Sequence, residues 1–201
     1  ILSSKYNFAL IMPTKNAEEY IADAIESYIR NIPFNSVLVI LEDHSKDQTY
    51  EICRHYENQY PAKIILRKNP FTGKVNAINY GESLVQYDFI KFVDSDDLIN
   101  QEFWEYFNTF SVRKESFIHP FSLVDKESKI LGDMPIKHLK HKDYKKYLKN
   151  LIVLPKASWT FFHNDIKGMF PMPEDLPFED IWFSFYYFTN GIEVNNVKQP
   201  L

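Results

Sequence analysis

The amino-acid sequence predicts an α/β fold with a mostly parallel central sheet flanked by helices. Short apolar segments alternate with helix-like segments in four successive steps within the first hundred residues. The apolar segments are nearly continuous, as expected for strands that helices cover on both faces. Strands separated by helices of this length predict right-handed crossovers, and the ligands of such sheets bind beyond the carboxyl ends of the strands. Functional residues are therefore expected at those ends.

The first half of the chain carries the regular alternation. Its expected strands cover residues 8–12, 37–41, 64–66 and 88–93. Pro13 ends the first strand, and apolar residues at three- and four-residue spacing then predict a helix over residues 20–29. A capping-box pattern at residues 45–48 predicts a helix through about residue 60, and another helix is expected over residues 73–86.

The second half is less regular. We expect helices over residues 100–110, 142–151 and 178–189, and strands over residues 117–124, 129–131, 158–163 and 192–197. At 201 residues the chain fits a single domain, because one hydrophobic core usually serves chains of up to roughly 250 residues. Residues 1–97 would form its nucleotide-binding half and residues 98–201 its substrate-specific half.

Composition and charge exclude several classes of protein. The chain is 45% hydrophobic and 25% charged, which is ordinary for a globular domain and not typical of a disordered one. A formal net charge of −4 gives no strong nucleic-acid signal. Cys53 is the only cysteine, so no intramolecular disulfide can form, and a reducing, cytoplasmic location is expected. The longest apolar runs are too short to span a bilayer.

Acidic side chains follow the second and the fourth of the expected strands. Glu42 and Asp43 end the second, and the cluster Asp94-Ser95-Asp96-Asp97 ends the fourth. Parallel strands place both groups at one edge of the sheet, where Mg²⁺ or Mn²⁺ could be held by one or two carboxylates and by substrate phosphate oxygens. The alternative is that these residues only favour turns and helix starts. The sequence contains no glycine-rich dinucleotide loop and no Walker lysine loop, so a metal-held diphosphate is the favoured ligand.

Five short segments resemble the motifs of family 2 glycosyltransferases, in the order found in that family. They are FALIMPTKN at residues 8–16, LVILEDHSKD at 38–47, GKVNAINYG at 73–81, FVDSDD at 92–97 and FED at 178–180. The resemblance implies the GT-A fold, a Rossmann-like sheet with a mixed acceptor-side second half. It also implies a metal-dependent, inverting transfer of a hexosyl or N-acetylhexosaminyl group. The donor would be a nucleoside-diphosphate sugar, with a UDP-sugar favoured, and the acceptor a hydroxyl group.

The resemblance also implies roles for the donor-side residues. Asp43 would hold the nucleobase or the ribose, although Glu42 and His44 stand where the family usually has aspartate and glycine. Asp96 would ligate the metal, and Asp97 has no assigned role. Asp94 would approach the ribose or take part in the metal site. The other residues expected to line the nucleotide pocket are Pro13, Thr14, Asn16, Glu42, Gly73, Lys74, Asn76, Asn79 and Ser95.

By the same resemblance, Asp180 is the catalytic base that takes the proton from the acceptor hydroxyl. The alternative is that Asp180 only stabilises the start of an apolar helix, where the macrodipole favours a negative charge. Glu174 and Asp175 lie nearby in the sequence and are weaker candidates for the same role.

Several other residues allow more than one interpretation. Trp182 is expected to belong to the core, whereas Trp159 could either pack in the core or stack on a sugar ring. Cys53 is expected to be a small buried side chain. His138 and His141 have helical spacing, but a solvated face is favoured over metal binding.

A lysine-rich segment surrounds Tyr144 and Tyr147. Its helix could rest on anionic lipid or grip a phosphate-bearing acceptor, and the alternative is an exposed solubilising helix. Together with the resemblance, this segment suggests a glycan, a lipid-linked saccharide or another hydroxyl acceptor at the inner face of a membrane, in surface polysaccharide or glycoconjugate synthesis. The lysines are Lys137, Lys140, Lys142, Lys145, Lys146 and Lys149.

Two rival functions are alternatives to transfer. Sugar-nucleotide synthesis usually shows an N-terminal glycine-rich triphosphate loop, which this sequence lacks. A catalytically inactive module that binds a saccharide or a nucleotide is the other alternative, and the intact Asp94, Asp96 and Asp180 argue against it. Family members commonly continue into a loop that covers the donor, so the acceptor half is expected to be truncated or minimal at Leu201.

Overall fold

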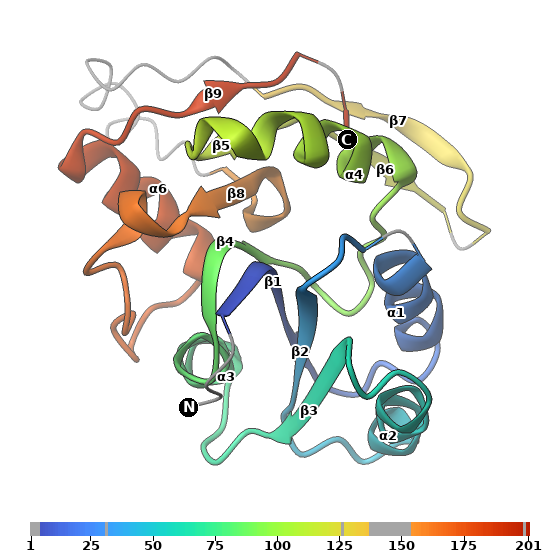
Figure 1. The fold of residues 1–201 in the computed structure, drawn as a ribbon. Coiled ribbons are helices and arrows are strands. Elements are labelled where there is room, and N and C mark those ends of the chain that lie inside the picture. Colours follow the sequence, from blue (N-terminus) through green and yellow to red (C-terminus); the bar gives the residue numbers. More distant parts are fainter. Residues whose placement is uncertain (1–4, 31, 126, 137–153, 199) are drawn as a thin grey trace.

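The computed structural model describes residues 5–30, 32–125, 127–136, 154–198 and 200–201. Its centre is a seven-stranded sheet in the order β3-β2-β1-β4-β8-β5-β9, with helices on both sides (Figure 1). The strands of the first half are β1 (Lys5–Thr14), β2 (Ser36–Glu42), β3 (Ile64–Lys68) and β4 (Gln86–Phe92). Those of the second half are β5 (Phe117–Ile118), β8 (Trp159–Phe162) and β9 (Asn195–Asn196). This architecture confirms the predicted α/β fold.

Helices connect the strands, and a hairpin lies outside the main sheet. The helices are α1 (Ile21–Arg30), α2 (Thr49–Gln59), α3 (Lys74–Ser83), α4 (Gln101–Phe110) and α6 (Glu179–Asn190). Three short 3-10 helices are η1 (Ser111–Arg113), η3 (Lys156–Ser158) and η4 (His163–Ile166). The separate antiparallel hairpin consists of β6 (Phe121–Val124) and β7 (Ile130–Met134).

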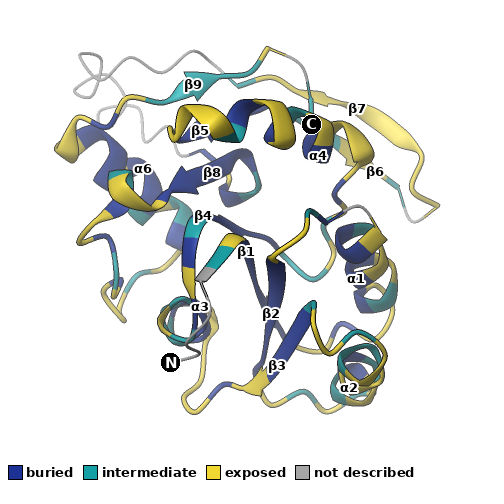
Figure 2. Cartoon of the chain, in the orientation of Figure 1, coloured by how far each residue is buried: buried dark blue, intermediate teal, exposed yellow. Residues whose placement is uncertain are grey.

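The apolar run in β1 explains why the sheet is covered on both faces. Side chains alternate along a strand, so Phe8, Leu10 and Met12 enter one layer while Ala9 and Ile11 enter the other. All five side chains are fully buried. The first layer contains residues of α1, α2 and α4, and the second contains residues of α3 and α6. Figure 2 shows the buried strands of the sheet between these helices, in contrast with the exposed β7.

Strand direction divides the sheet into two parts. β1 pairs in parallel with β2 and β4, and β2 pairs in parallel with β3. β8 is antiparallel to both β4 and β5, and β9 runs parallel to β5. The regular parallel part therefore comes from the first half of the chain, and the mixed part comes from the second half, as the sequence predicted.

Several predicted elements are placed differently in the structure: the helix expected over residues 73–86 ends at Ser83, and the strand expected over residues 192–197 covers only Asn195–Asn196. The helix expected from residue 45 begins at Thr49, because Ser45 and Asp47 accept hydrogen bonds from the neighbouring loop, and Asp47 also accepts from the N–H of Thr49. The strand expected over residues 117–124 is divided into β5 and β6. Pro120 lies at the division and has no backbone N–H with which to continue the ladder.

Some predictions fall outside the described residues. They are the helix over residues 142–151, the two histidines His138 and His141, and the lysine-rich segment around them. Among the helices that the structure describes, none combines the length and the apolar character needed to cross a membrane.

The burial of three side chains, Trp159, Trp182 and Cys53, shows how each contributes to the structure. Trp159 is fully buried and stacks on Phe161 with ring centroids 5.2 Å apart, so it belongs to the core. Trp182 is half-buried, and its indole N–H donates to the carbonyl of Met169 at 2.9 Å. Cys53 is buried on α2. Burial, together with the nearby charge of Glu42, raises the pKa of its thiol to about 12.

Candidate active site

The strand register brings the predicted donor-side residues to one edge of the sheet. Thr14, the last residue of β1, is opposite Glu42, the last residue of β2, and Glu42 is opposite Lys68 in β3. The backbone N–H of Val93 donates to the carbonyl of Ile11 at 3.1 Å, so the chain leaves β4 at the same edge. The acidic residues that follow β2 and β4 are therefore neighbours in space, as the parallel topology predicted.

The loops after β1 and β2 are joined by reciprocal hydrogen bonds. The N–H of Asn16 donates to Oγ of Ser45 at 3.0 Å, and the side chain of Asn16 accepts from the N–H of Lys46 at 2.9 Å. Asn16 and His44 have positive φ values of 48° and 57°. Asparagine and histidine are among the residues that tolerate this left-handed conformation. These hydrogen bonds join the two loops into one border of the site.

Glu42 and Thr14 contribute to this border from below. Glu42 is buried, and its Oε1 accepts a hydrogen bond from the N–H of Ser45. Oγ1 of Thr14 donates to the carbonyl of Met12 at 3.4 Å, and both Thr14 and Pro13 are buried. These buried side chains therefore support the backbone of the loops, and the exposed residues of the site belong to the same loops.

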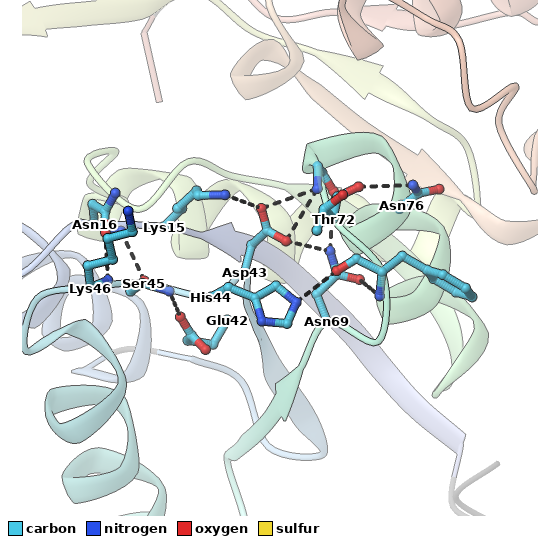
Figure 3. A network of polar contacts seen from close by, with 12 residues as sticks. Lys15, Asn16, Glu42, Asp43, His44, Ser45, Lys46, Asn69, Thr72 and Asn76 are labelled. Carbon is cyan, nitrogen blue, oxygen red and sulfur yellow. Dashed lines mark hydrogen bonds and ion pairs between the residues drawn. The ribbon is translucent and has the colours of Figure 1, made fainter.

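Asp43 lies at the centre of a hydrogen-bond network (Figure 3). Its Oδ1 accepts from Nδ2 of Asn69 at 2.8 Å, and its two oxygens accept from the N–H of Gly73 at 3.3 and 3.2 Å. Nζ of Lys15 forms an ion pair with Oδ2 at 3.1 Å. Burial would raise the pKa of Asp43, but the hydrogen bonds from Asn69, Lys15 and Gly73 outweigh it and lower the pKa. Asp43 is thus held as a buried carboxylate.

The cluster after β4 forms a tight turn in which the three aspartates differ. The N–H of Asp97 donates to the carbonyl of Asp94 at 3.2 Å, and Oδ2 of Asp97 accepts from the N–H of Asp94 at 2.9 Å. The hydroxyl of Tyr28 donates to the carbonyl of Asp97 at 2.6 Å. Burial and the charge of Asp94 raise the pKa of Asp97. Asp97 therefore shapes the turn, Ser95 is half-buried, and Asp96 is exposed.

A compact group of four charges lies between this turn and α6. Nζ of Lys74 is 2.6 Å from Oδ1 of Asp94 and 3.1 Å from Oε1 of Glu179. Nζ of Lys156 contacts the same two oxygens, with 3.0 Å to Glu179. Burial would raise the pKa of both carboxyl groups, but Lys156 and Lys74 lower it. Both carboxylates are therefore held ionised.

Asp180 adjoins this group. Its Oδ1 accepts a hydrogen bond from the backbone N–H of Lys156 at 2.6 Å. Burial and the neighbouring charge of Glu179 raise the pKa of Asp180. The other two acidic candidates, Glu174 and Asp175, are exposed in the preceding loop. Asp180 thus has the environment of a proton acceptor, because a carboxylate with a raised pKa binds a proton more readily.

A cavity of about 390 Å³ adjoins the four-charge group. Asn79 does not line it: its side chain exchanges hydrogen bonds of 2.9 and 2.7 Å with the backbone of Met172, which fixes the loop before α6 to α3. The lining combines the start of α3 with an apolar and acidic segment before α6, namely Thr72, Gly73, Lys74, Val75, Asn76, Glu174, Leu176, Pro177, Phe178 and Glu179.

The predicted metal ligands fit a cation whose coordination shell would be completed by substrate phosphates. Within the described residues, no group of three or more histidine, cysteine, aspartate or glutamate side chains could enclose a metal. Mg²⁺ and Mn²⁺ sites of nucleotide enzymes commonly use only one or two carboxylates and fill the rest of the shell with phosphate and water. Asp96 is exposed and Asp94 is partly exposed at the same turn, so this pair matches that type of site.

The prediction from sequence missed four residues of the site. Asn69 directly follows β3, so the strand-end argument that selected Asp43 would also have selected it. Lys15 lies within a loop that had already been assigned to the pocket. Glu179 precedes the predicted base and was not given a separate role. Lys156 had no signal in the sequence, since only the folded chain brings it to Asp94.

Comparisons with known proteins agree on one family. The model of the family described as "Glycosyl transferase family 2" matches residues 9–121. The minor teichoic acid biosynthesis protein GgaB of Bacillus subtilis is 37% identical over 105 residues, which are 51% of this chain and 12% of that protein. The poly(ribitol-phosphate) beta-N-acetylglucosaminyltransferase TarS of Staphylococcus aureus is 33% identical over 97 residues, 47% of this chain and 17% of TarS. The chain thus spans less than a fifth of either relative.

Solved structures share the fold over nearly the whole chain. TarS 1-349 in complex with UDP-GlcNAc has a TM-score of 0.73 at 20% identity, covering 96% of this chain and 56% of that structure. The mannosyltransferase PcManGT from Pyrobaculum calidifontis, in complex with GDP-Man and Mn²⁺, has a TM-score of 0.65 at 14% identity, covering 98% of this chain and 56% of that one. These similarities confirm the predicted GT-A fold, including its mixed second half.

Proposed function

The chain belongs to glycosyl transferase family 2, and on that premise we propose that it moves a sugar from a nucleoside-diphosphate sugar to an acceptor hydroxyl with inversion. The single observation that carries the proposal is the position of Asp180. This carboxylate accepts a hydrogen bond from Lys156, whose side chain contacts Asp94 at the donor edge. An acceptor-side base and a donor-side carboxylate are therefore joined through one residue beside a cavity.

The donor would bind along the sheet edge formed by residues 1–97. Asp43, fixed by Asn69 and Gly73, would accept hydrogen bonds from a nucleobase or a ribose. Gly73 and Lys74 line the cavity, where the ammonium of Lys74 would attract the diphosphate. The structural likeness to TarS bound to UDP-GlcNAc supports a UDP-sugar as the donor, and an N-acetylhexosamine or hexose as the sugar.

Asp96 and Asp94 would hold a divalent cation, Mn²⁺ or Mg²⁺, together with the diphosphate. The cation would stabilise the negative charge that develops on the leaving diphosphate. The presence of Mn²⁺ in the PcManGT complex, which has the same fold, supports this assignment. The protein's own contribution is to present the two carboxylates at one turn, which Asp97 and Tyr28 fix through the hydrogen bonds described above.

Asp180 would act as the general base. Its ionised carboxylate takes the proton of the acceptor hydroxyl while the hydroxyl oxygen forms a bond to the anomeric carbon. The bond from that carbon to the diphosphate oxygen breaks on the opposite face, so the configuration inverts and the diphosphate leaves with the bonding electrons. The backbone N–H of Lys156 donates to Oδ1 of Asp180, and Oδ2 would receive the proton.

The acceptor would be bound by residues 98–201. The names of GgaB and TarS refer to teichoic acid and poly(ribitol-phosphate), which supports a role in the synthesis of a surface polysaccharide or another glycoconjugate. A lipid-linked saccharide or another hydroxyl compound fits the same chemistry. Contact of the lysine-rich segment with the cytoplasmic face of a membrane is part of this proposal.

A donor panel tests the proposed function. Hydrolysis of several nucleotide sugars would be measured with and without Mn²⁺, since slow hydrolysis requires no acceptor. We expect Mn²⁺-dependent hydrolysis of a UDP-sugar, and calorimetry should show that Asp96→Ala weakens UDP binding in the presence of Mn²⁺ by about 10- to 100-fold. Failure of UDP to bind would overturn the proposal. UDP binding without hydrolysis or transfer to any acceptor would instead support the inactive binding module.

A further inference from the structure

Lys156 is a buried lysine whose position follows from the antiparallel part of the sheet. It begins η3, directly before β8, and β8 pairs with β4 in antiparallel register. The residues before β8 therefore lie beside those after β4, which include Asp94. Only 3% of the Lys156 side chain is exposed. Lysine is almost never buried to this extent unless its ammonium group is paired.

The contacts of Lys156 reach both sides of the proposed reaction. Its Nζ contacts Oδ1 of Asp94 and lies 3.0 Å from Oε1 of Glu179. Its backbone N–H donates to Oδ1 of Asp180 at 2.6 Å. One residue thus joins the carboxylate at the donor edge to both acidic residues at the start of α6.

Lys74 contacts the same two carboxylate oxygens but has a different environment. Its side chain is 43% exposed and lines the cavity, whereas the Lys156 side chain is enclosed. The two ammonium groups balance the charges of Asp94 and Glu179. When a diphosphate enters the cavity, Lys74 would turn toward it. Lys156 would then remain as the cation that keeps the two carboxylates together.

We infer that Lys156 is a positioning residue for glycosyl transfer: its ammonium holds Asp94 against Glu179 while its N–H orients Asp180. This inference rests on the proposed function, because it assigns a task within that reaction. Lys156 would act through the carboxylates that it contacts, because its own side chain is enclosed. It sets the separation between the donor edge and the base, and a displacement of about 1 Å between reacting groups can cost roughly 100-fold in rate.

Lys156→Met separates the contacts of the ammonium group from the hydrogen bond of the backbone N–H. Methionine retains the backbone N–H to Asp180 and much of the side-chain volume, but it removes the ammonium. Before the donor binds, Lys74 still pairs with both Asp94 and Glu179, so donor binding should change little. Once Lys74 turns to the diphosphate, Glu179 has lost both cations at the first turn of α6, so the helix start that carries Asp180 should shift. The expected defect is therefore in kcat rather than in the KM for the donor.

The test is steady-state transfer with the UDP-sugar that the donor panel identifies. For Lys156→Met we expect kcat to fall about 10- to 100-fold while the donor KM changes by less than about threefold. Lys156→Arg retains the positive charge and should recover kcat to within about fivefold of the wild type. The control is Lys129→Met, an exposed lysine before β7, which should leave both constants unchanged.

Three results would overturn the inference. An unchanged kcat in Lys156→Met would show that the ammonium positions nothing. A loss of UDP binding equal to the loss of kcat would make Lys156 a donor ligand. If melting curves show that Lys156→Met is unfolded, Glu179→Gln removes the same contact from the other partner, and an unchanged kcat there would also overturn it. An inactive wild-type chain would overturn the proposed function itself, which the donor panel detects separately.

Discussion

The donor edge and the acceptor side hold their carboxylates in different ways. At the donor edge, Asp43 is fixed by Lys15, Asn69 and Gly73, which follow neighbouring strands or begin the next helix. Most of these contacts are hydrogen bonds within one layer of loops. On the acceptor side, Asp180 is fixed through Lys156 and hence through a buried group of opposite charges. The donor edge depends on sheet topology, and the acceptor side depends on charge pairing.

This difference determines how each region should respond to change. A network of hydrogen bonds can lose one member and keep the others, so its contribution to binding decreases in small steps. A buried ion pair that loses one partner leaves an unpaired charge, which is strongly unfavourable. We therefore expect moderate effects at the donor edge and large effects on the acceptor side.

The largest effect is expected from Asp180→Asn, because an amide cannot accept the proton of the acceptor hydroxyl. General bases typically contribute about 10²- to 10⁴-fold to a rate, so transfer should fall roughly a thousandfold while UDP affinity stays the same. Transfer assays and calorimetry measure the two quantities. Asp175→Asn, an exposed neighbour in the preceding loop, is the control. Full transfer by Asp180→Asn would show that Asp180 is not the base. The acceptor side would then have no carboxylate to compare with Asp43.

The second-largest effect is expected in the pH dependence, which should differ between transfer and UDP binding. The pKa of Asp180 is raised by burial and by the charge of Glu179, and the base must be ionised to act. Transfer should therefore fall about tenfold for each pH unit below that raised pKa. The pKa of Asp43 is lowered, so UDP binding should persist to a lower pH than transfer does. If kcat/KM and UDP affinity declined together, a single shared group would have to control both.

Asp43→Asn should have a smaller effect. The amide keeps the size of the side chain and can still accept from Gly73, but it loses the ion pair with the half-exposed Lys15. We expect UDP affinity to fall about tenfold, or 1.4 kcal/mol, and the free energy of unfolding to fall by about 1–2 kcal/mol. Calorimetry and urea unfolding test this, with the exposed Glu51→Gln on α2 as control. A thousandfold loss would show that the donor edge is as sensitive as the acceptor side.

The smallest effect is expected in the β6-β7 hairpin, which belongs to neither carboxylate network. Ile130 in β7 is 65% exposed, so Ile130→Ser should change the free energy of unfolding by less than about 0.5 kcal/mol. Transfer and UDP affinity should remain unchanged. A fall in transfer with stable folding would show that the hairpin takes part in acceptor binding, and the acceptor side would have to be extended to include it.

The parallel part of the fold could be predicted because its signals are local. Continuous apolar runs such as that from Phe8 to Met12 identify strands covered on both faces, and parallel pairing then places Asp43 and Asp94 at one edge. The second half of the chain lacks such local signals. There the strands are short, and Pro120 divides a run that otherwise resembles one strand. The pairing of β8 with β4 joins segments about seventy residues apart, which no local pattern indicates.

In the candidate site, too, residues within recognisable motifs could be predicted, and a residue defined only by long-range contacts could not. Motif resemblance identified Asp43, Asp94, Asp96 and Asp180 as separate positions in the sequence. It did not identify Lys156, because an isolated lysine has no characteristic spacing and its importance arises only from burial between two carboxylates. It left Asp97 without an assigned role. The hydrogen bond from the N–H of Asp94 gives Asp97 its place in the turn.

The burial of Cys53 makes the chain convenient for spectroscopy. A thiol with its pKa raised to about 12 remains protonated near neutral pH, so it reacts slowly with maleimides and iodoacetamides. Since no second cysteine exists in the sequence, one introduced at the cavity rim, for example by Glu174→Cys, would carry a fluorescent label at a single position. The occupancy of the cavity could then be followed in real time without first removing the native cysteine.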